Sequence, residues 1–456
     1  MFRRLLYRNL KLVYKVTNWN RDRLTPAGTL ILGGMFAAGI FGVDVRQSLA
    51  FHIFAILASL LVVAVLFNVS FRGHFQVRRL LPQYATVNRP LRYRIEVNNL
   101  ANVGQHDLFV IDELDSVFPR YEEFETSTDP QDRKRNRFDR VVGYPRLMAL
   151  IRRKRGGTID PVSVEHVRPQ HASYIDMILH PARRGYIEFS KIRVCRSDPL
   201  GLIRAMKKFM LRDKLLVLPG TYQVPLIEFE GARKYQQGDM SLASSVGDSQ
   251  EFLSLRDYQP GDPLRAIHWR SYARLGEPVV KEFHDEFFVR HGLVLDTFRG
   301  MRSEQVFEEA ISVAASFCLD MPGQDSLLDL MFVAEKTYRV TSGRGLSQAE
   351  DILEMLACVQ ASDESRFNQL ADVVLRHCDE TSGMVFIFMD WDEPRQALVN
   401  ELIQRGLPVL VYVVLENEGV EIAPGPMAVH ANRLVPLYCG KVQENLMALS
   451  PTAVDR

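Results

Sequence analysis

Two uncharged apolar segments near the N-terminus constrain this chain more than any other feature. The first is Ala27–Val43 and the second is Leu49–Val69, with the polar break Asp44–Ser48 between them. A helix needs about 20 apolar residues to cross a bilayer, with about 17 as the lower limit. The second segment exceeds this length and the first just reaches it. The sequence therefore predicts a hairpin of two membrane helices within residues 24–70.

Two other interpretations of the first segment stay open. A signal peptide would need a small-residue cleavage site leading into a mature domain, and a second apolar segment follows instead. A buried pair of helices in a soluble protein is the other alternative.

Basic residues flank the hairpin on both sides, so the positive-inside rule predicts that both ends are cytoplasmic, including the basic N-terminus at residues 1–23. The five scattered cysteines fit a reducing compartment.

The next part of the chain has the alternation of β-strands. From Phe75 onward apolar residues recur with a period of two, and turn signals separate the runs. We predict a β-sandwich-like domain over residues 71–220, with a basic insertion at 121–160 that is helical over Pro145–Arg153. Basic clusters beside a membrane anchor can contact anionic lipid, but we favour a solvated loop. The charges come without an aromatic ladder, which argues against nucleic acid.

The last part, residues 291–456, predicts a doubly wound α/β domain, because apolar strands alternate with amphipathic helices. The expected strands are His291–Asp296, Leu327–Val333, Thr337–Val340, Met384–Met389 and Val409–Val414. The expected helices are Glu304–Leu319, Leu346–Val359, Arg366–His377 and Pro394–Arg405. Ligands of such sheets bind at the carboxyl ends of the strands, where Asp296 and Asp390 are expected.

A charged segment, Asp257–Lys281, precedes this domain within residues 221–290. Its sequence is D-Y-Q-P-G-D-P-L-R-A-I-H-W-R-S-Y-A-R-L-G-E-P-V-V-K. Asp262 can cap a helix and Pro263 suits the first turn, so we expect a helix that runs to about Arg274 and ends at Gly276. A strand is expected at Glu277–Phe283.

This segment resembles the signature of a bacterial family called domain of unknown function 58. The run E-F-x-x-L-R-D-Y-x-x-G-D-x-x-R-x-I-H-W-x-x-x-A-R at Glu251–Arg274, followed by V-V-K-E-F, carries the resemblance. The run R-R-G-Y-I-E-F…D-P-L-G-L at Arg183–Leu202 is similar to the element that precedes the signature. The resemblance implies a protein of the bacterial inner membrane whose C-terminal part is like a von Willebrand factor A domain. It also implies a partnership with a MoxR-type AAA+ ATPase in assembly or chaperone-like roles, and no established reaction.

The resemblance raises the question of a metal site. Metal-binding von Willebrand factor A domains use D-x-S-x-S after the first strand, whereas this chain has D-T-F-R-G from Asp296 to Gly300. Asp296 and Thr297 keep oxygen ligands and Asp390 is a candidate for a later acidic ligand, but both serine positions are lost. We expect neither a metal nor a cofactor at this degenerate site.

The signature residues form either a structural network or a partner-binding surface. They are Arg256, Asp257, Tyr258, Gly261, Asp262, Arg265, His268, Trp269, Arg274 and Lys281. We favour a network of Arg–carboxylate pairs with Asp257, Asp262 and Glu282, over recognition of an acidic segment or a phosphate. We also expect a packed Trp269 with His268 beside it, because no nucleophile stands at a recognisable spacing.

These patterns lead to one functional expectation. The chain is predicted to be a non-enzymatic, multi-pass adaptor of the inner membrane with cytoplasmic domains, working with a MoxR-type ATPase. An envelope-associated scaffold without an ATPase is the alternative, and an uncharacterised hydrolase is the less favoured one.

Overall fold

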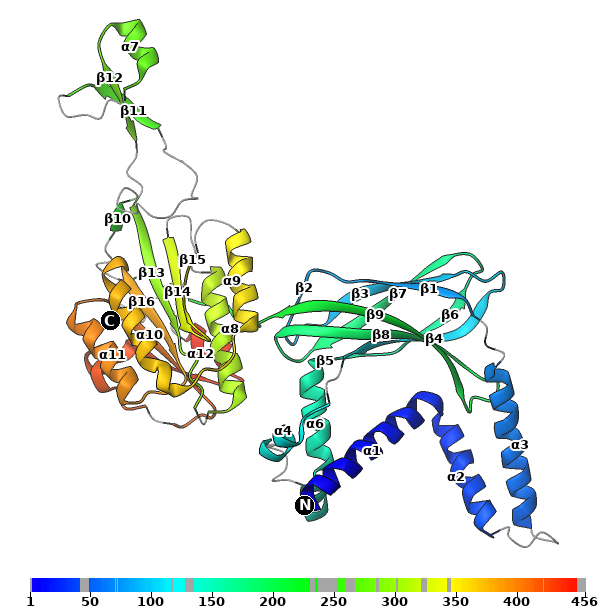
Figure 1. The fold of residues 1–456 in the computed structure, drawn as a ribbon. Helices are drawn as coiled ribbons and strands as arrows, with labels where there is room; N and C mark the ends of the chain where they lie inside the picture. The colour runs from blue at the N-terminus through cyan, green and yellow to red at the C-terminus, as the bar shows by residue number, and fades with distance from the viewer. Residues whose placement is uncertain are drawn as a thin grey trace. The chain divides into compact units, whose positions relative to one another are not determined.

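The structure divides into two units that are described separately. The computed structural model describes residues 2–41, 49–69, 71, 73–115, 118–127, 135–225, 227, 229, 234–236, 252–259, 267–283, 287–300, 302–320, 326–342, 346–420 and 422–448. Contacts between residues group the chain into Met1–Pro219 and Gly220–Arg456, and Figure 1 shows the elements of each.

Three helices open the first unit. They are α1 (Phe2–Arg23), α2 (Pro26–Phe41) and α3 (Leu49–Val69). Among the described residues, α3 alone is long and apolar enough to cross a membrane, and α2 is a shorter apolar helix. A Cβ added at Gly34 of α2 would lie 3.4 Å from Leu57 of α3, so the two helices pack side by side. The second membrane span stays a prediction, and the break Asp44–Ser48 lies outside the described residues.

The strands of the first unit form two sheets that share a core. One sheet has the order β1-β3-β7-β5 and the other β2-β9-β8-β4-β6. Their bounds are β1 (Phe75–Leu80), β2 (Tyr84–Thr86), β3 (Leu91–Asn99), β4 (Gln105–Leu114), β5 (Gly157–Ile159), β6 (Val162–Val167), β7 (Ala172–Pro181), β8 (Gly185–Ser197) and β9 (Arg204–Leu218). Alternate residues of both sheets, such as Ile95 and Val194, are fully buried in one cluster. The residues with period two are therefore the ones that face the interior.

The helix predicted over Pro145–Arg153 of the basic insertion is present, but the expectation that the rest of its described part is a solvated loop was wrong. The insertion forms α4 (Tyr121–Thr126), α5 (Arg137–Val142) and α6 (Tyr144–Arg155), whereas residues 128–134 lie outside the described chain. Leu147 and Ile151 of α6 are buried with Leu10 of α1 and Phe124 of α4. Burying such a side chain fully stabilises by about 1.5–3 kcal/mol, which explains why this charged sequence is ordered.

The second unit is an α/β domain around one sheet of seven strands. Its six-strand path is β15-β14-β13-β16-β17-β18, with β10 (Lys234–Gln236) paired to β13. The strands are β13 (Phe287–Leu295), β14 (Ser326–Val333), β15 (Thr337–Ser342), β16 (Gly383–Phe388), β17 (Val409–Leu415) and β18 (Leu434–Tyr438). In chain order along β13 to β18 the path is 3-2-1-4-5-6, the order of doubly wound folds. β15 alone of these six runs antiparallel to its neighbour.

Helices cover both faces of this sheet (Figure 1). They are α8 (Glu304–Asp320), α9 (Leu346–Cys358), α10 (Phe367–His377), α11 (Glu393–Gln404) and α12 (Val442–Met447), with short 3-10 helices η4 (Glu364–Arg366), η5 (Cys378–Glu380) and η6 (Gly425–Arg433). All six residues of β16 are buried, because one face packs on α10 and α11 and the other on α8. The predicted α/β class is confirmed, and β18 was missed.

The signature segment forms a small element of its own. Strands β11 (Phe252–Asp257) and β12 (Val279–Phe283) pair antiparallel, and the helix α7 (Trp269–Leu275) lies between them in the chain. The helix that was expected to run to about Arg274 begins at Trp269 in the described chain. Ile267 does not belong to it, because this residue forms a β-bridge with Val280. Gly276 ends the helix with φ +77°, as its sequence position predicts.

Candidate functional site

The carboxyl edge of the second unit's sheet is the place where this fold offers a ligand site. The chain turns outward in opposite directions from β13 and β16, so the crevice of a doubly wound sheet lies above these two neighbours. Asp296 follows β13 directly, and Met389 and Asp390 follow β16. α11 begins a few residues later, with Asp392 as its N-cap.

A buried ion pair fills this crevice. Asp296 is 0% exposed, and one of its carboxylate oxygens accepts a hydrogen bond from Arg395 Nε at 2.7 Å. The same oxygen accepts from the backbone of Met389 at 3.2 Å, while the other accepts from Phe298 N at 2.8 Å. Arg395 is 3% exposed and reaches Asp392 at 2.7 Å through its Nη1. Both charges therefore have good partners although they are withdrawn from water.

The electrostatics favour the ionised pair. Burial raises the pKa of the Asp296 carboxyl above its ordinary value, and Arg395 and the two backbone amides only partly offset this. Burial alone would lower the pKa of Arg395, but the carboxylates of Asp296 and Asp392 outweigh this and raise it. The proton therefore stays on the guanidinium. The guanidinium carbon also lies 5.1 Å from the centre of the Phe367 ring, a cation–π contact that supports the buried charge.

The donor set at this edge does not fit a divalent metal. Arg395 brings a positive charge to the carboxylate that would be the first ligand. The Thr297 hydroxyl donates to the carbonyl of Val333, and Asp390 pairs with Arg302 through its Oδ2. Magnesium needs near-octahedral oxygen ligands at about 2.0–2.1 Å, and these oxygens are already engaged. The residues of the degenerate site, Asp296, Thr297 and Asp390, lie at one edge but make different contacts.

The loops of this edge are braced against one another. The backbone N–H of Ser362 donates to the Thr297 carbonyl at 2.8 Å. Gly300 has φ +53°, and a Cβ there would lie 2.0 Å from a carboxylate oxygen of Glu364. Any side chain at this position would have to displace Glu364 and would adopt a strained backbone. The edge is thus built as a rigid, closed surface.

The signature residues are only partly within the described chain. Gly261, Asp262 and Arg265 lie outside it, and so do the side chains of Arg256 and Lys281, whose backbones belong to β11 and β12. Asp257 closes β11 opposite Val279, and Tyr258 N–H donates to the Pro278 carbonyl at 3.0 Å. The full Arg–carboxylate network stays a prediction.

The helix α7 exposes its largest side chains, which corrects the expectation of a packed tryptophan. Trp269 is 61% exposed and Tyr272 is 41% exposed, with their ring centres 6.1 Å apart. His268 Nδ1 lies 2.6 Å from the Ser271 hydroxyl at the start of the helix. Arg270 and Arg274 are exposed, and neither has an ion-pair partner among the described residues. The Trp269 side chain points to solvent because Ile267, not Trp269, fills the space beside β12.

The other family-like run, D-P-L-G-L at Asp198–Leu202, forms a turn that binds Thr25. The sequence did not predict this contact. One Asp198 carboxylate oxygen accepts from the backbones of Leu202 and Ile203 at 2.7 and 2.6 Å, which closes the turn. The Thr25 hydroxyl donates to the carbonyl of Gly201 at 2.5 Å, and its backbone N–H donates to that of Leu202 at 3.0 Å. This turn therefore holds the chain where α1 passes into α2. The Asp–Pro and Leu–Gly pairs signalled a turn, but nothing in the sequence named Thr25 as its partner.

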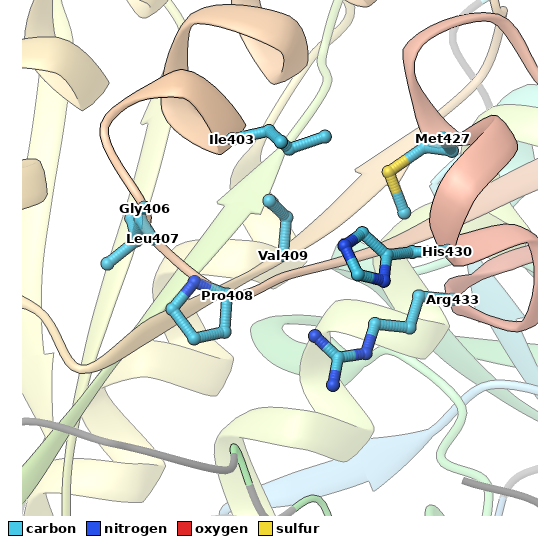
Figure 2. A pocket seen from close by; sticks show the side chains of 8 residues that line it. All are labelled: Ile403, Gly406, Leu407, Pro408, Val409, Met427, His430 and Arg433. Atoms are coloured by element: carbon cyan, nitrogen blue, oxygen red, sulfur yellow. The ribbon is translucent and has the colours of Figure 1, made fainter. Parts of the chain in front are cut away.

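Two cavities of the second unit are less informative than these contacts. Figure 2 shows a cavity of about 180 Å³ with His430 and Arg433 of η6 on one side and Leu407 and Pro408 on the other. It opens at the amino end of β17, away from the carboxyl edge. A larger cavity of about 480 Å³ lies beside the end of β14 and is lined by Tyr338 and Cys358. Among the described residues, the larger cavity is lined by Cys358 and Ser362 but by no histidine, and the smaller one by His430 but by no Ser, Thr or Cys.

Comparison with known proteins identifies the signature segment and most of the α/β domain. Residues 254–417 match the model of the family described as "Protein of unknown function DUF58". This stretch of the chain is therefore similar to the DUF58 family. The uncharacterised protein YeaD of Bacillus subtilis (strain 168) is 28% identical over 198 residues. That match covers 43% of this chain and 44% of YeaD, so less than half of the relative's length is aligned.

A solved structure of a von Willebrand factor type A protein from Catenulispora acidiphila is also similar. It is 9% identical, with a TM-score of 0.28, and the match covers 39% of this chain and 45% of the other. At this TM-score the likeness adds nothing to the strand order of the second unit, which defines the fold class on its own.

Proposed function

We propose that this chain is a membrane-anchored, non-enzymatic interaction protein. Its α2–α3 hairpin holds it in the bacterial inner membrane with the two folded units in the cytoplasm. The surface of α7 binds a protein partner. By the family resemblance, that partner is a MoxR-type AAA+ ATPase acting in assembly or chaperone-like processes.

The exposed face of α7 carries this proposal. Interface hot spots are enriched in Trp, Tyr and Arg, and α7 presents Trp269, Arg270, Tyr272 and Arg274 within seven residues. A large aromatic side chain left 61% exposed has unfavourable contact with water that a partner would relieve. The β11–β12 pair ties both ends of this helix, so the surface is presented with little conformational freedom.

The closed carboxyl edge supports the non-enzymatic part. In a catalytic site a carboxylate must reach a substrate proton or a metal, whereas Asp296 is saturated by Arg395 and two backbone amides. The pair gives the domain a rigid frame from which a partner surface can act.

The apolar helices support the anchor. α3 has 21 residues and a mean hydropathy of 2.7, which is enough to span the hydrocarbon core. α2, with 16 residues, reaches across only if the residues that follow it continue the apolar segment, as the sequence predicts.

A binding measurement tests the partner surface. The detergent-solubilised chain and a purified MoxR-type ATPase from the same organism are mixed with ATP or ADP, and the dissociation constant is measured by biolayer interferometry. The double variant W269A/Y272A should lose about 2 kcal/mol or more of binding free energy, because both hot-spot rings are removed.

The matched control is Y174A/Y186A, which removes two tyrosines that are 62% and 54% exposed on the β-sandwich. Unchanged affinity in W269A/Y272A would remove α7 from the interface. No binding of the unmodified chain under either nucleotide would refute the ATPase as the partner.

A further inference from the structure

The first helix has one apolar face that is already satisfied within its unit. Leu10 is 5% exposed and belongs to the cluster of Phe124, Leu147 and Ile151. On the same face, the rings of Tyr7 and Tyr14 lie 5.9 and 5.6 Å from that of Phe118. These contacts hold α1 against α4 and α6.

A second apolar stripe runs along the opposite side of α1. It consists of Leu5, Leu12, Val16 and Trp19, which are 57%, 56%, 63% and 61% exposed. At 3.6 residues per turn these four fall within an arc of about 60° around the helix axis. The inward face of Tyr7 and Tyr14 is centred on the other side of that axis. The stripe therefore has no part in the packing of α1 against its own unit.

Basic residues border this stripe along one side. They are Arg4, Arg8, Lys11 and Lys15, all exposed. The helix thus has an apolar stripe, a basic flank and a tryptophan at one end. This arrangement is typical of a helix that lies in the membrane–water interface. The long basic side chains can extend from there to lipid phosphates while their stems cover apolar surface.

The chain path brings this helix to the membrane surface. α1 ends at Arg23 and α2 begins at Pro26, and the intervening Leu24 and Thr25 are held by the Leu202–Ile203 turn. Figure 1 shows α1 bending away from α2 instead of continuing its axis. If α2 and α3 cross the bilayer, as proposed above, this sharp bend keeps α1 next to the bilayer with its apolar stripe uncovered.

A second surface of the same kind lies close to the N-terminal end of α1. Phe138 and Val141 of α5 are 74% and 65% exposed and lie one turn apart. A cavity of about 530 Å³ opens beside them and is lined by Arg3, Arg137 and Arg140, among others. Arg137 and Arg140 are exposed and have no ion-pair partner among the described residues. The exposed apolar residues suit the acyl-chain region of a lipid surface, and the unpaired arginines beside them suit its phosphate region.

We infer that α1 and α5 dock on the anionic cytoplasmic leaflet of the membrane. The stripe Leu5–Trp19 and the pair Phe138 and Val141 enter the boundary between headgroups and acyl chains. Arg137 and Arg140 beside the cavity contact the phosphates of anionic phospholipids. This inference rests on the proposed hairpin anchor and extends it, because it gives the first unit a fixed orientation on the bilayer.

The three tryptophans of the chain allow a test with an internal control. One variant, W269F/W391F, keeps Trp19 alone, and another, W19F/W391F, keeps Trp269 alone. Both remaining rings are 61% exposed in the protein. Each full-length variant is reconstituted into vesicles of phosphatidylcholine with phosphatidylglycerol, some made with acyl-chain-brominated lipid. Fluorescence quenching is then measured with acrylamide in the water and with bromine in the bilayer.

The expected result separates the two tryptophans. Brominated lipid should quench Trp19 strongly and Trp269 little, and acrylamide should quench Trp19 several-fold less than Trp269. Adding L12E and V16E to the Trp19 variant should restore acrylamide quenching, because two charges within the stripe oppose its insertion into lipid. Both positions are exposed, so the fold tolerates the change. R137Q/R140Q in the same background should weaken bromine quenching of Trp19 in anionic vesicles, whereas R92Q/R376Q, which removes two exposed arginines elsewhere, should not.

Vesicle flotation with carbonate extraction tells the two proposals apart. If the chain floats with vesicles and resists extraction but acrylamide quenches Trp19 as strongly as Trp269, the anchor stands and the docking of α1 is refuted. If the chain is extracted, the anchor itself fails and the docking falls with it. Equal bromine quenching of Trp19 in vesicles of phosphatidylcholine alone would refute the requirement for anionic lipid.

Discussion

The second unit contains two arginine-bearing regions with opposite designs, the carboxyl edge and α7. At the edge, Arg395 is 3% exposed against a fully buried Asp296. On α7, Arg270 and Arg274 are exposed beside a tryptophan that is 61% exposed. Buried charge must be paired, because desolvation costs several kcal/mol per ion, whereas exposed charge needs no fixed partner. The contrast separates an arginine that holds the fold from arginines that are free to meet another molecule.

The largest expected effect comes from breaking the buried pair. R395M keeps a side chain of comparable length but leaves the Asp296 carboxylate buried without its counter-charge. Removing one partner of a buried pair costs about 3–5 kcal/mol. We therefore expect a corresponding loss in the free energy of unfolding of the second unit, measured by denaturant unfolding of the detergent-solubilised chain.

The double variant D296L/R395M is the control for this prediction. Replacing both members of a buried pair by apolar residues is often neutral or stabilising, so most of the lost stability should return. A single variant R395M as stable as the unmodified protein would show that the pair contributes no stability at this edge.

The same contrast marks the limit of what the sequence could predict. Periodicity located β13 to β17 and α8 to α11 within a few residues, because buried strands and amphipathic helices follow from local pattern. β18 escaped because Leu434–Tyr438 is short and has a proline within it. Asp296 and Arg395 are 99 residues apart, so only the folded sheet brings them together.

Charge was also a poor guide to exposure in the first unit. The insertion at 121–160 looked solvated because of its Lys and Arg content, yet Leu147 and Ile151 form the buried face of α6. Conversely, Trp269 was expected to be packed beside His268 and is mostly exposed. In both cases the decisive information was which elements lie alongside, and a single sequence does not contain it.

A smaller, pH-dependent effect is expected from His291, a buried base on β13, the strand that Asp296 follows. It is 7% exposed, and its ring centre lies 5.7 Å from that of Phe229. Burial lowers the pKa of His291 below its ordinary value. The unfolded chain therefore binds this proton more tightly than the folded chain. The stability contributed by the neutral ring is complete above about pH 6.5 and declines as the pH falls through the lower folded-state pKa.

Unfolding midpoints at about pH 7.5 and about pH 5.5 test this sign. The unmodified chain should lose stability on acidification, and H291F should lose less, since phenylalanine keeps an aromatic ring but binds no proton. Equal acid sensitivity of the two proteins would assign the effect to other groups.

The smallest effect on stability is expected from the other side of the comparison, α7. R270Q/R274Q removes two exposed charges that have no ion-pair partner among the described residues, and such surface changes are usually within about 0.5 kcal/mol. The free energy of unfolding should therefore stay close to that of the unmodified chain, while affinity for the ATPase falls. A loss of stability approaching that of R395M would instead place Arg274 in a structural network with residues outside the described chain. Weakened binding at unchanged stability is the combination that distinguishes a partner-binding arginine from one that holds the fold.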